Sequence, residues 1–62
     1  MNAVKLPVET WIIDFYDAQG QKIDTKEVHR AYAPTRWAEN HVLTLRRRME
    51  GAKVTYSIEH MS

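Results

Sequence analysis

Three histidines and eight acidic residues are the side chains that could carry acid–base or metal chemistry. His29, His41 and His60 show no short ligand spacing, and no cysteine is present to complete a ligand set. A zinc site needs three or four converging ligands, which this pattern does not indicate. Asp14 and Asp17 flank a turn, where turn geometry and solubility account for carboxylates. There is also no glycine-rich phosphate loop or nucleophile motif, so we expect no metal, no cofactor and no catalysis.

A basic helix carries the strongest candidate for a binding surface. On a helical wheel, the side opposite its apolar stripe forms what we call the outer face: Arg36, Asn40, Leu43 and Arg47. Trp37 and Arg48 lie at the edge of this face. The core does not need Leu43, and an apolar side chain among arginines is typical of an interface anchor. Arginine also binds carboxylates and phosphates through paired hydrogen bonds, so we predict that these six residues contact a partner.

The helix that positions this face has clear start and stop signals. Thr35 follows a proline and is expected to be the N-cap, and Gly51 is expected to be the left-handed C-cap. Between them, apolar residues recur at intervals of four, three and four, which predicts one buried stripe: Ala38, Val42, Leu45 and Met49.

Three strands are predicted around this helix, at Val8–Tyr16, Gln21–Tyr32 and Lys53–His60, with a turn at residues 17–20. In the first strand, one face holds Trp11, Ile13 and Phe15, which we expect to be buried against the helix. In the last strand, Val54, Tyr56 and Ile58 alternate with polar residues, so one side is expected to be buried. The second strand is ambiguous, because Ile23 and Val28 are five residues apart. A bulge near residues 25–26 would place both on one face, whereas a regular strand would place Val28 on the opposite face.

This order predicts an α+β fold with a three-stranded antiparallel sheet, strand order 2-1-3, and one helix packed on one face. Residues 1–7 are expected to form a flexible N-terminal arm and residues 8–62 a single small domain. The other face of the sheet has nothing to cover it, so Ile12 and Tyr16 are expected to be partly exposed as an alternative contact surface. We expect this face or the sheet edges to support self-association, most simply as a homodimer.

Composition and charge narrow the class of protein further. With 62 residues, 44% hydrophobic and 27% charged, the chain reads as one small soluble domain, which we expect to be cytoplasmic. No apolar run is long enough for a membrane span. The net charge of +1 conceals a split, with a local charge of −3 over residues 9–27 and +3 over residues 28–62. Such a dipolar surface can orient a partner, unlike the uniformly basic surface of a dedicated nucleic-acid binder.

The segment from Arg30 to Glu39, closed by Gly51-Ala52-Lys53-Val54-Thr55-Tyr56, resembles small phage proteins that take over host machinery. In outline, the region from Trp11 to Glu59 is most similar to the T7-type inhibitors of bacterial RNA polymerase. It departs from them because its last strand lacks their arginines and its helix is more basic. The resemblance implies a small inhibitor that occludes a larger host protein in a bacterial cytoplasm.

Two functions from different classes therefore stand at this point. The first is a non-enzymatic protein-binding module whose partner is a larger host protein with an acidic patch. The second is a small DNA-binding domain that uses basic side chains of the helix and sheet edge: Arg36, Arg46, Arg47, Arg48 and Lys53. The hairpin and helix are also similar to the arm-binding domains of phage integrases, although there the third strand precedes the helix, and here the first hairpin is acidic.

Overall fold

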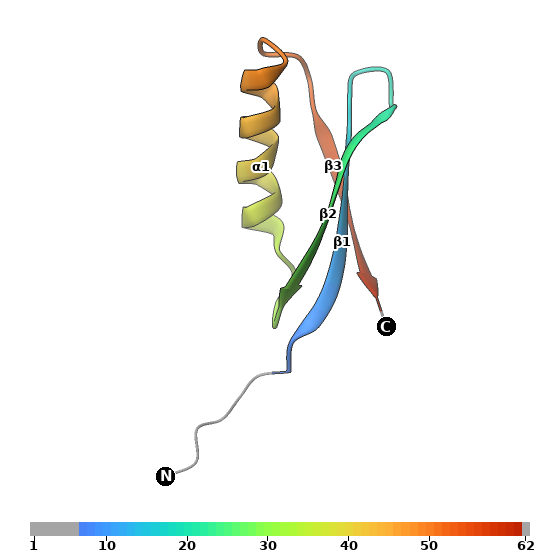
Figure 1. Cartoon of the computed structure of the whole chain (residues 1–62), viewed down its shortest axis with the longest axis vertical. Helices are drawn as coiled ribbons and strands as arrows, with labels where there is room; N and C mark the ends of the chain where they lie inside the picture. Colours follow the sequence, from blue (N-terminus) through green and yellow to red (C-terminus); the bar gives the residue numbers. More distant parts are fainter. Residues whose placement is uncertain (1–6, 62) are drawn as a thin grey trace.

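The computed structural model describes residues 7–61 and shows the chain order strand, strand, helix, strand. The elements are β1 (Glu9–Tyr16), β2 (Lys22–Arg30), α1 (Thr35–Arg48) and β3 (Thr55–Met61). β1 is the central strand and pairs antiparallel with both neighbours, in the order β2-β1-β3. α1 lies along one side of this sheet (Figure 1). The predicted α+β fold, strand order and helix position are confirmed.

The predicted N-terminal arm, residues 1–7, lies outside the described residues except for Pro7. Pro7 and Val8 precede β1 and are both exposed, so β1 begins one residue later than its pattern predicted. Val8 therefore contributes nothing to the sheet.

The hairpin between β1 and β2 closes through the carboxylate of Asp17. Asp17 Oδ1 accepts hydrogen bonds from the backbone N–H groups of Gln19 and Gln21, both at 2.9 Å. Gly20 has a φ of 79°, which glycine adopts without steric cost, and its N–H donates to the Asp17 carbonyl at 3.0 Å. The turn therefore forms where the sequence predicted it.

The strand pairing departs from the predicted position of the bulge. Phe15 pairs with Asp24 and Tyr16 with Lys22, so Ile23 is the extra residue and the irregularity lies there, not near residues 25–26. Ile23 and Val28 consequently both pack against the core on the helix side. The same shift brings Asp24 onto the helix side, because it lies opposite the buried Phe15.

The core lies between α1 and this face of the sheet. Five core side chains are buried, Ile13, Phe15, Ala38, Leu45 and Val54, and Pro34 before α1 is buried as well. Trp11 was expected among them but is only half-buried, because the sheet extends past the first turn of α1 at its end (Figure 1). Its ring stacks on His60 with centroids 4.5 Å apart, and its Nε1 donates to the Arg30 carbonyl.

Both helix ends differ by one position from the sequence signals. The Ala38 N–H donates to the Pro34 carbonyl at 2.9 Å, so Pro34 is the N-cap and Thr35 is the first helical residue. No side chain caps this end. At the other end Met49 is the C-cap, and the left-handed position after it holds Glu50, with a φ of 57°. Gly51 follows with a φ of 83°, so it is left-handed as predicted but one residue beyond the cap position.

Candidate functional site

The outer face of α1 is exposed along its whole length. Arg36, Asn40, Leu43 and Arg47 are spaced four, three and four residues apart on the side away from the core, and all four are exposed. Leu43 is 53% exposed, whereas the opposite side of the same helix supplies two buried core residues, Ala38 and Leu45. The four residues of the outer face therefore form one exposed row along the helix.

The arginines of α1 are not neutralised by the protein itself. Among residues 7–61, every ion pair joins strand residues to each other or to His41, and none involves an arginine. Three of these arginines, at positions 46–48, occupy the last turn of the helix, where cations interact favourably with the helix dipole. That interaction accounts for their position but leaves their guanidinium groups available to an external anion.

A shallow hollow lies beside Leu43. It has a volume of about 320 Å³ and is lined by Leu43, Arg46, Arg47 and Gly51. A hollow lined by one leucine and two arginines suits a partner side chain that is apolar and flanked by carboxylates.

The two residues predicted at the edge of the outer face have different surroundings. Arg48 is exposed, as the wheel indicated. Trp37 is half-buried, because it packs against the core. Its ring stacks on His41, with centroids 5.1 Å apart and planes 14° apart. Trp37 is thus a structural neighbour of the core with one side toward solvent, not a free edge of the outer face.

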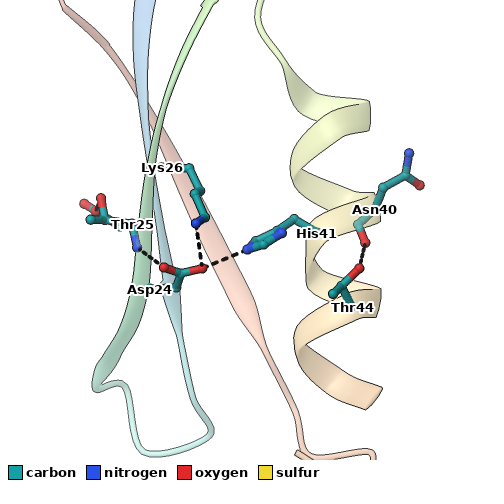
Figure 2. A network of polar contacts seen from close by, with 7 residues as sticks. Asp24, Thr25, Lys26, Asn40, His41 and Thr44 are labelled. Carbon is teal, nitrogen blue, oxygen red and sulfur yellow. Dashed lines mark hydrogen bonds and ion pairs between the residues drawn. The ribbon is translucent and has the colours of Figure 1, made fainter. Parts of the chain in front are cut away.

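His41 and Asp24 join the helix to the sheet. His41 Nε2 lies 2.8 Å from Asp24 Oδ2, and Lys26 Nζ lies 3.9 Å from the same oxygen (Figure 2). The hydrogen bond from His41 is the main cause that lowers the pKa of Asp24, assisted by the Thr25 N–H and Lys26 and opposed by burial. This contact joins one flank of α1 to β2, while the buried Ala38 and Leu45 face the sheet and the outer face lies toward solvent.

The arrangement around His41 is that of a structural contact. Its imidazole lies edge-on to Phe15, with ring centroids 4.7 Å apart, and on its other side it stacks on Trp37. The other two histidines each pair with one carboxylate, His29 with Glu27 and His60 with Glu9. Within residues 7–61, no cluster of three histidine or acidic side chains is placed to hold a metal ion.

The alternative surface, the sheet face without the helix, is less apolar than predicted. Ile12 and Tyr16 lie there and are half-buried, but Val28 lies on the helix side instead. Ile12 lies between Glu27 and Glu59 on the neighbouring strands. Asp14 accepts a hydrogen bond from Thr25 at 2.7 Å and pairs with Lys22, so polar contacts occupy much of this face.

Sequence reasoning missed the contact between His41 and Asp24. The signal available was the spacing of Trp37 and His41, four residues apart on one flank of the helix, which predicts that their rings meet. Their partner on β2 could not be found in this way, because it depends on the bulge at Ile23.

The helix of the described region is too short and too polar to cross a membrane. Comparison with protein-family models, with curated proteins and with solved structures finds no match.

Proposed function

We propose that this chain is a small protein-binding module without catalytic activity, which docks the outer face of α1 on an acidic patch of a larger protein. The observation that carries this proposal is the half-exposed Leu43 beside arginines that have no carboxylate partner among residues 7–61. Burying a leucine of this exposure on a partner removes apolar surface from water, which favours association. Arginine beside it can then form paired hydrogen bonds with carboxylates.

The distribution of charge supports a single docking orientation. Arg36 and Arg47 lie on the helix side, whereas the register places Glu27 and Glu59 beside Ile12 on the opposite face of the sheet. An acidic partner is therefore attracted by one side and repelled by the other. Complementary charge of this kind speeds encounter and sets orientation more than it adds affinity.

We infer the class of partner from the resemblance of the sequence pattern to small phage proteins that take over host machinery. On that basis, the chain acts in a bacterial cytoplasm as an inhibitor that occludes a site on a host protein or complex. Occlusion needs only a binding surface, so it suits a module that acts through one exposed helix face.

Duplex DNA is the second candidate, and the unpaired arginines favour it as well. Arg36, Arg46, Arg47, Arg48 and Lys53 would then contact phosphates, which position a protein without reading sequence. Leu43 separates the two proposals, because phosphates offer no apolar surface to a leucine.

The test is capture from bacterial lysate, after nuclease treatment, with the wild type and the double variant Leu43→Ala/Arg47→Glu as bait. Mass spectrometry should identify at least one protein that the wild type captures and the double variant loses. The control is Ile12→Ala, on the opposite face, which should capture the same protein as the wild type. Equal capture by the double variant would show that the outer face is not the contact surface.

A further inference from the structure

A second, larger groove lies at the opposite end of α1 from the hollow beside Leu43. Its volume is about 630 Å³, roughly twice that of the hollow. One wall is the end of β2, at residues 29–30, with the connecting segment at residues 31–34, and the other is formed by Arg36, Trp37 and Asn40 of the helix. We call it the Tyr32 groove.

The Tyr32 groove is cationic. Arg30 and Arg36 line it, and no acidic residue does. Neither arginine forms an ion pair within residues 7–61, and the first turn of α1 carries no acidic residue. His29, which also lines the groove, is held by Glu27 at 3.2 Å and by Thr10 at 3.1 Å. The two guanidinium groups are therefore the charged groups available to an anionic ligand.

The same groove presents two aromatic rings. Tyr32 is 72% exposed, which is high for so large an apolar ring. One face of the Trp37 ring stacks on His41, which is in turn hydrogen-bonded to Asp24, and these contacts hold the ring in place. A rigid indole and a freely accessible phenol on one cationic groove provide stacking surfaces for planar rings.

We propose that the Tyr32 groove binds single-stranded nucleic acid, with bases stacked on Tyr32 and Trp37 and phosphates held by Arg30 and Arg36. Proteins that bind single strands combine a cationic groove with aromatic side chains on which successive bases stack. Asn40, at the rim, offers an amide that can pair with a base edge. An acidic peptide would use the arginines but would leave both rings without a planar partner.

This inference concerns a different part of α1 from the hollow beside Leu43. The Tyr32 groove uses the segment before α1 and the first turns of the helix, whereas the hollow beside Leu43 uses its last turns. Arg36 and Asn40 belong to both the outer face and the Tyr32 groove, so Tyr32 and Leu43, each of which lines only one of the two sites, separate the two tests.

The test is a fluorescence titration of the Trp11→Phe variant, in which Trp37 is the remaining tryptophan. The titrant is a twelve-nucleotide oligothymidylate at low salt, with duplex DNA of the same length and polyglutamate as separate arms. We expect the single strand to quench Trp37, and Tyr32→Ala to weaken binding about tenfold, because stacking one base contributes about 1–3 kcal/mol. Arg30→Ala and Arg36→Ala should each weaken binding and reduce the salt slope by about 0.7.

The matched control is Arg48→Ala, which removes the same charge at the far end of α1 and should change the affinity less than twofold. Amide chemical shifts of the wild type provide a second measurement that does not depend on the Trp11→Phe variant folding. Single-stranded DNA should move the signals of residues 29–40 and leave those of residues 43–51 in place. The proposal is overturned if Arg48→Ala weakens binding as much as Arg36→Ala, if Tyr32→Ala has no effect, or if polyglutamate or duplex DNA binds as well as the single strand.

Discussion

The imidazole of His41 makes three kinds of contact in a small space. It hydrogen-bonds Asp24 on β2, stacks on Trp37 of its own helix, and meets the ring of Phe15 on β1 edge-on. Its side chain is only 16% exposed, whereas that of His29 is 57% exposed. Two histidines that look alike in the sequence thus have different roles, because only one lies between the helix and the sheet.

His41→Ala should lower the free energy of unfolding by about 1–2 kcal/mol, through loss of the hydrogen bond and the ring contacts. For a domain of this size, that change corresponds to about 5–15 °C in the thermal midpoint. His29→Ala is the matched control and should stay within about 0.5 kcal/mol of the wild type, because its pair with Glu27 is exposed. Thermal denaturation followed by circular dichroism checks both variants, and equal midpoints for them would contradict this role of His41.

Acid stability should report on Asp24. The pKa of Asp24 is lowered by folding, so the folded chain binds fewer protons there than the unfolded chain. Its contribution is complete above the ordinary value of 3.8 and is lost as the pH falls below it toward the folded value. The wild type should therefore lose more stability between pH 5 and pH 3 than Asp24→Asn does, as measured by urea denaturation. Parallel losses in the two proteins would mean that other carboxylates control acid unfolding.

Single residues could be predicted from the sequence where periodicity alone decides their exposure. Leu43 is one such residue, because a helical wheel places it opposite the buried stripe whatever the tertiary structure. Asp24 is not, because its side of the sheet depends on one extra residue at Ile23, and pairing between strands determines where that residue falls. Trp11 was misplaced for a similar reason, since strand alternation gives its face but not how far the helix reaches along the sheet.

At the scale of elements, the C-terminal end of α1 stores backbone strain at Glu50. The Gly51 N–H donates to the Arg46 carbonyl at 2.7 Å and the Glu50 N–H to the Arg47 carbonyl at 3.4 Å, which is the Schellman pattern. In this pattern the left-handed residue is usually glycine, but here it is Glu50, with a φ of 57°. A carboxylate at this end also interacts unfavourably with the helix dipole.

Glu50→Gly should therefore raise the free energy of unfolding by about 0.5–1 kcal/mol, even though glycine usually weakens a chain by its entropy. Glu50→Ala is the control, because it removes the charge but keeps a Cβ in the left-handed region. It should gain at most a few tenths of a kcal/mol. Chemical denaturation of the two variants compares them, and a loss of stability in Glu50→Gly would show that the left-handed conformation costs little here.

The strands and helix were predictable because their apolar residues alternate or recur at a helical interval. Tyr56 and Ile58 lie opposite Phe15 and Ile13, as alternation in the last strand predicted. The exact caps were less predictable, because both ends offer two adjacent candidates. The candidates are Pro34 and Thr35 at the N-terminal end of α1, and Glu50 and Gly51 at its C-terminal end. Backbone hydrogen bonds decide between the two residues of each pair.

At the scale of the whole molecule, α1 covers one face of the sheet, and no other element among residues 7–61 covers the opposite face, here called the open face. The open face carries Ile12 and Tyr16 among ion pairs and hydroxyl contacts, including Tyr16 Oη to Ser57 Oγ at 3.5 Å. Self-association through this face or through the edges of β2 and β3 remains a prediction, with a dimer as the expected species. Sedimentation equilibrium at tens of micromolar should give twice the chain mass of 7.3 kDa, and a monomer at that concentration would exclude the dimer.

Leu43 gives the most direct test of the central claim, that the outer face of α1 binds an acidic protein. Leu43→Ala alone should leave the fold unchanged, because the side chain is 53% exposed, and should reduce capture of the partner from nuclease-treated lysate at least fivefold. Val8→Ala is the matched control, since Val8 is 66% exposed and lies outside the helix, and it should capture the partner at the level of the wild type. Undiminished capture by Leu43→Ala would contradict the claim, and duplex DNA binding that weakens on removing Arg36 or Arg47 would then favour nucleic acid as the ligand of this face.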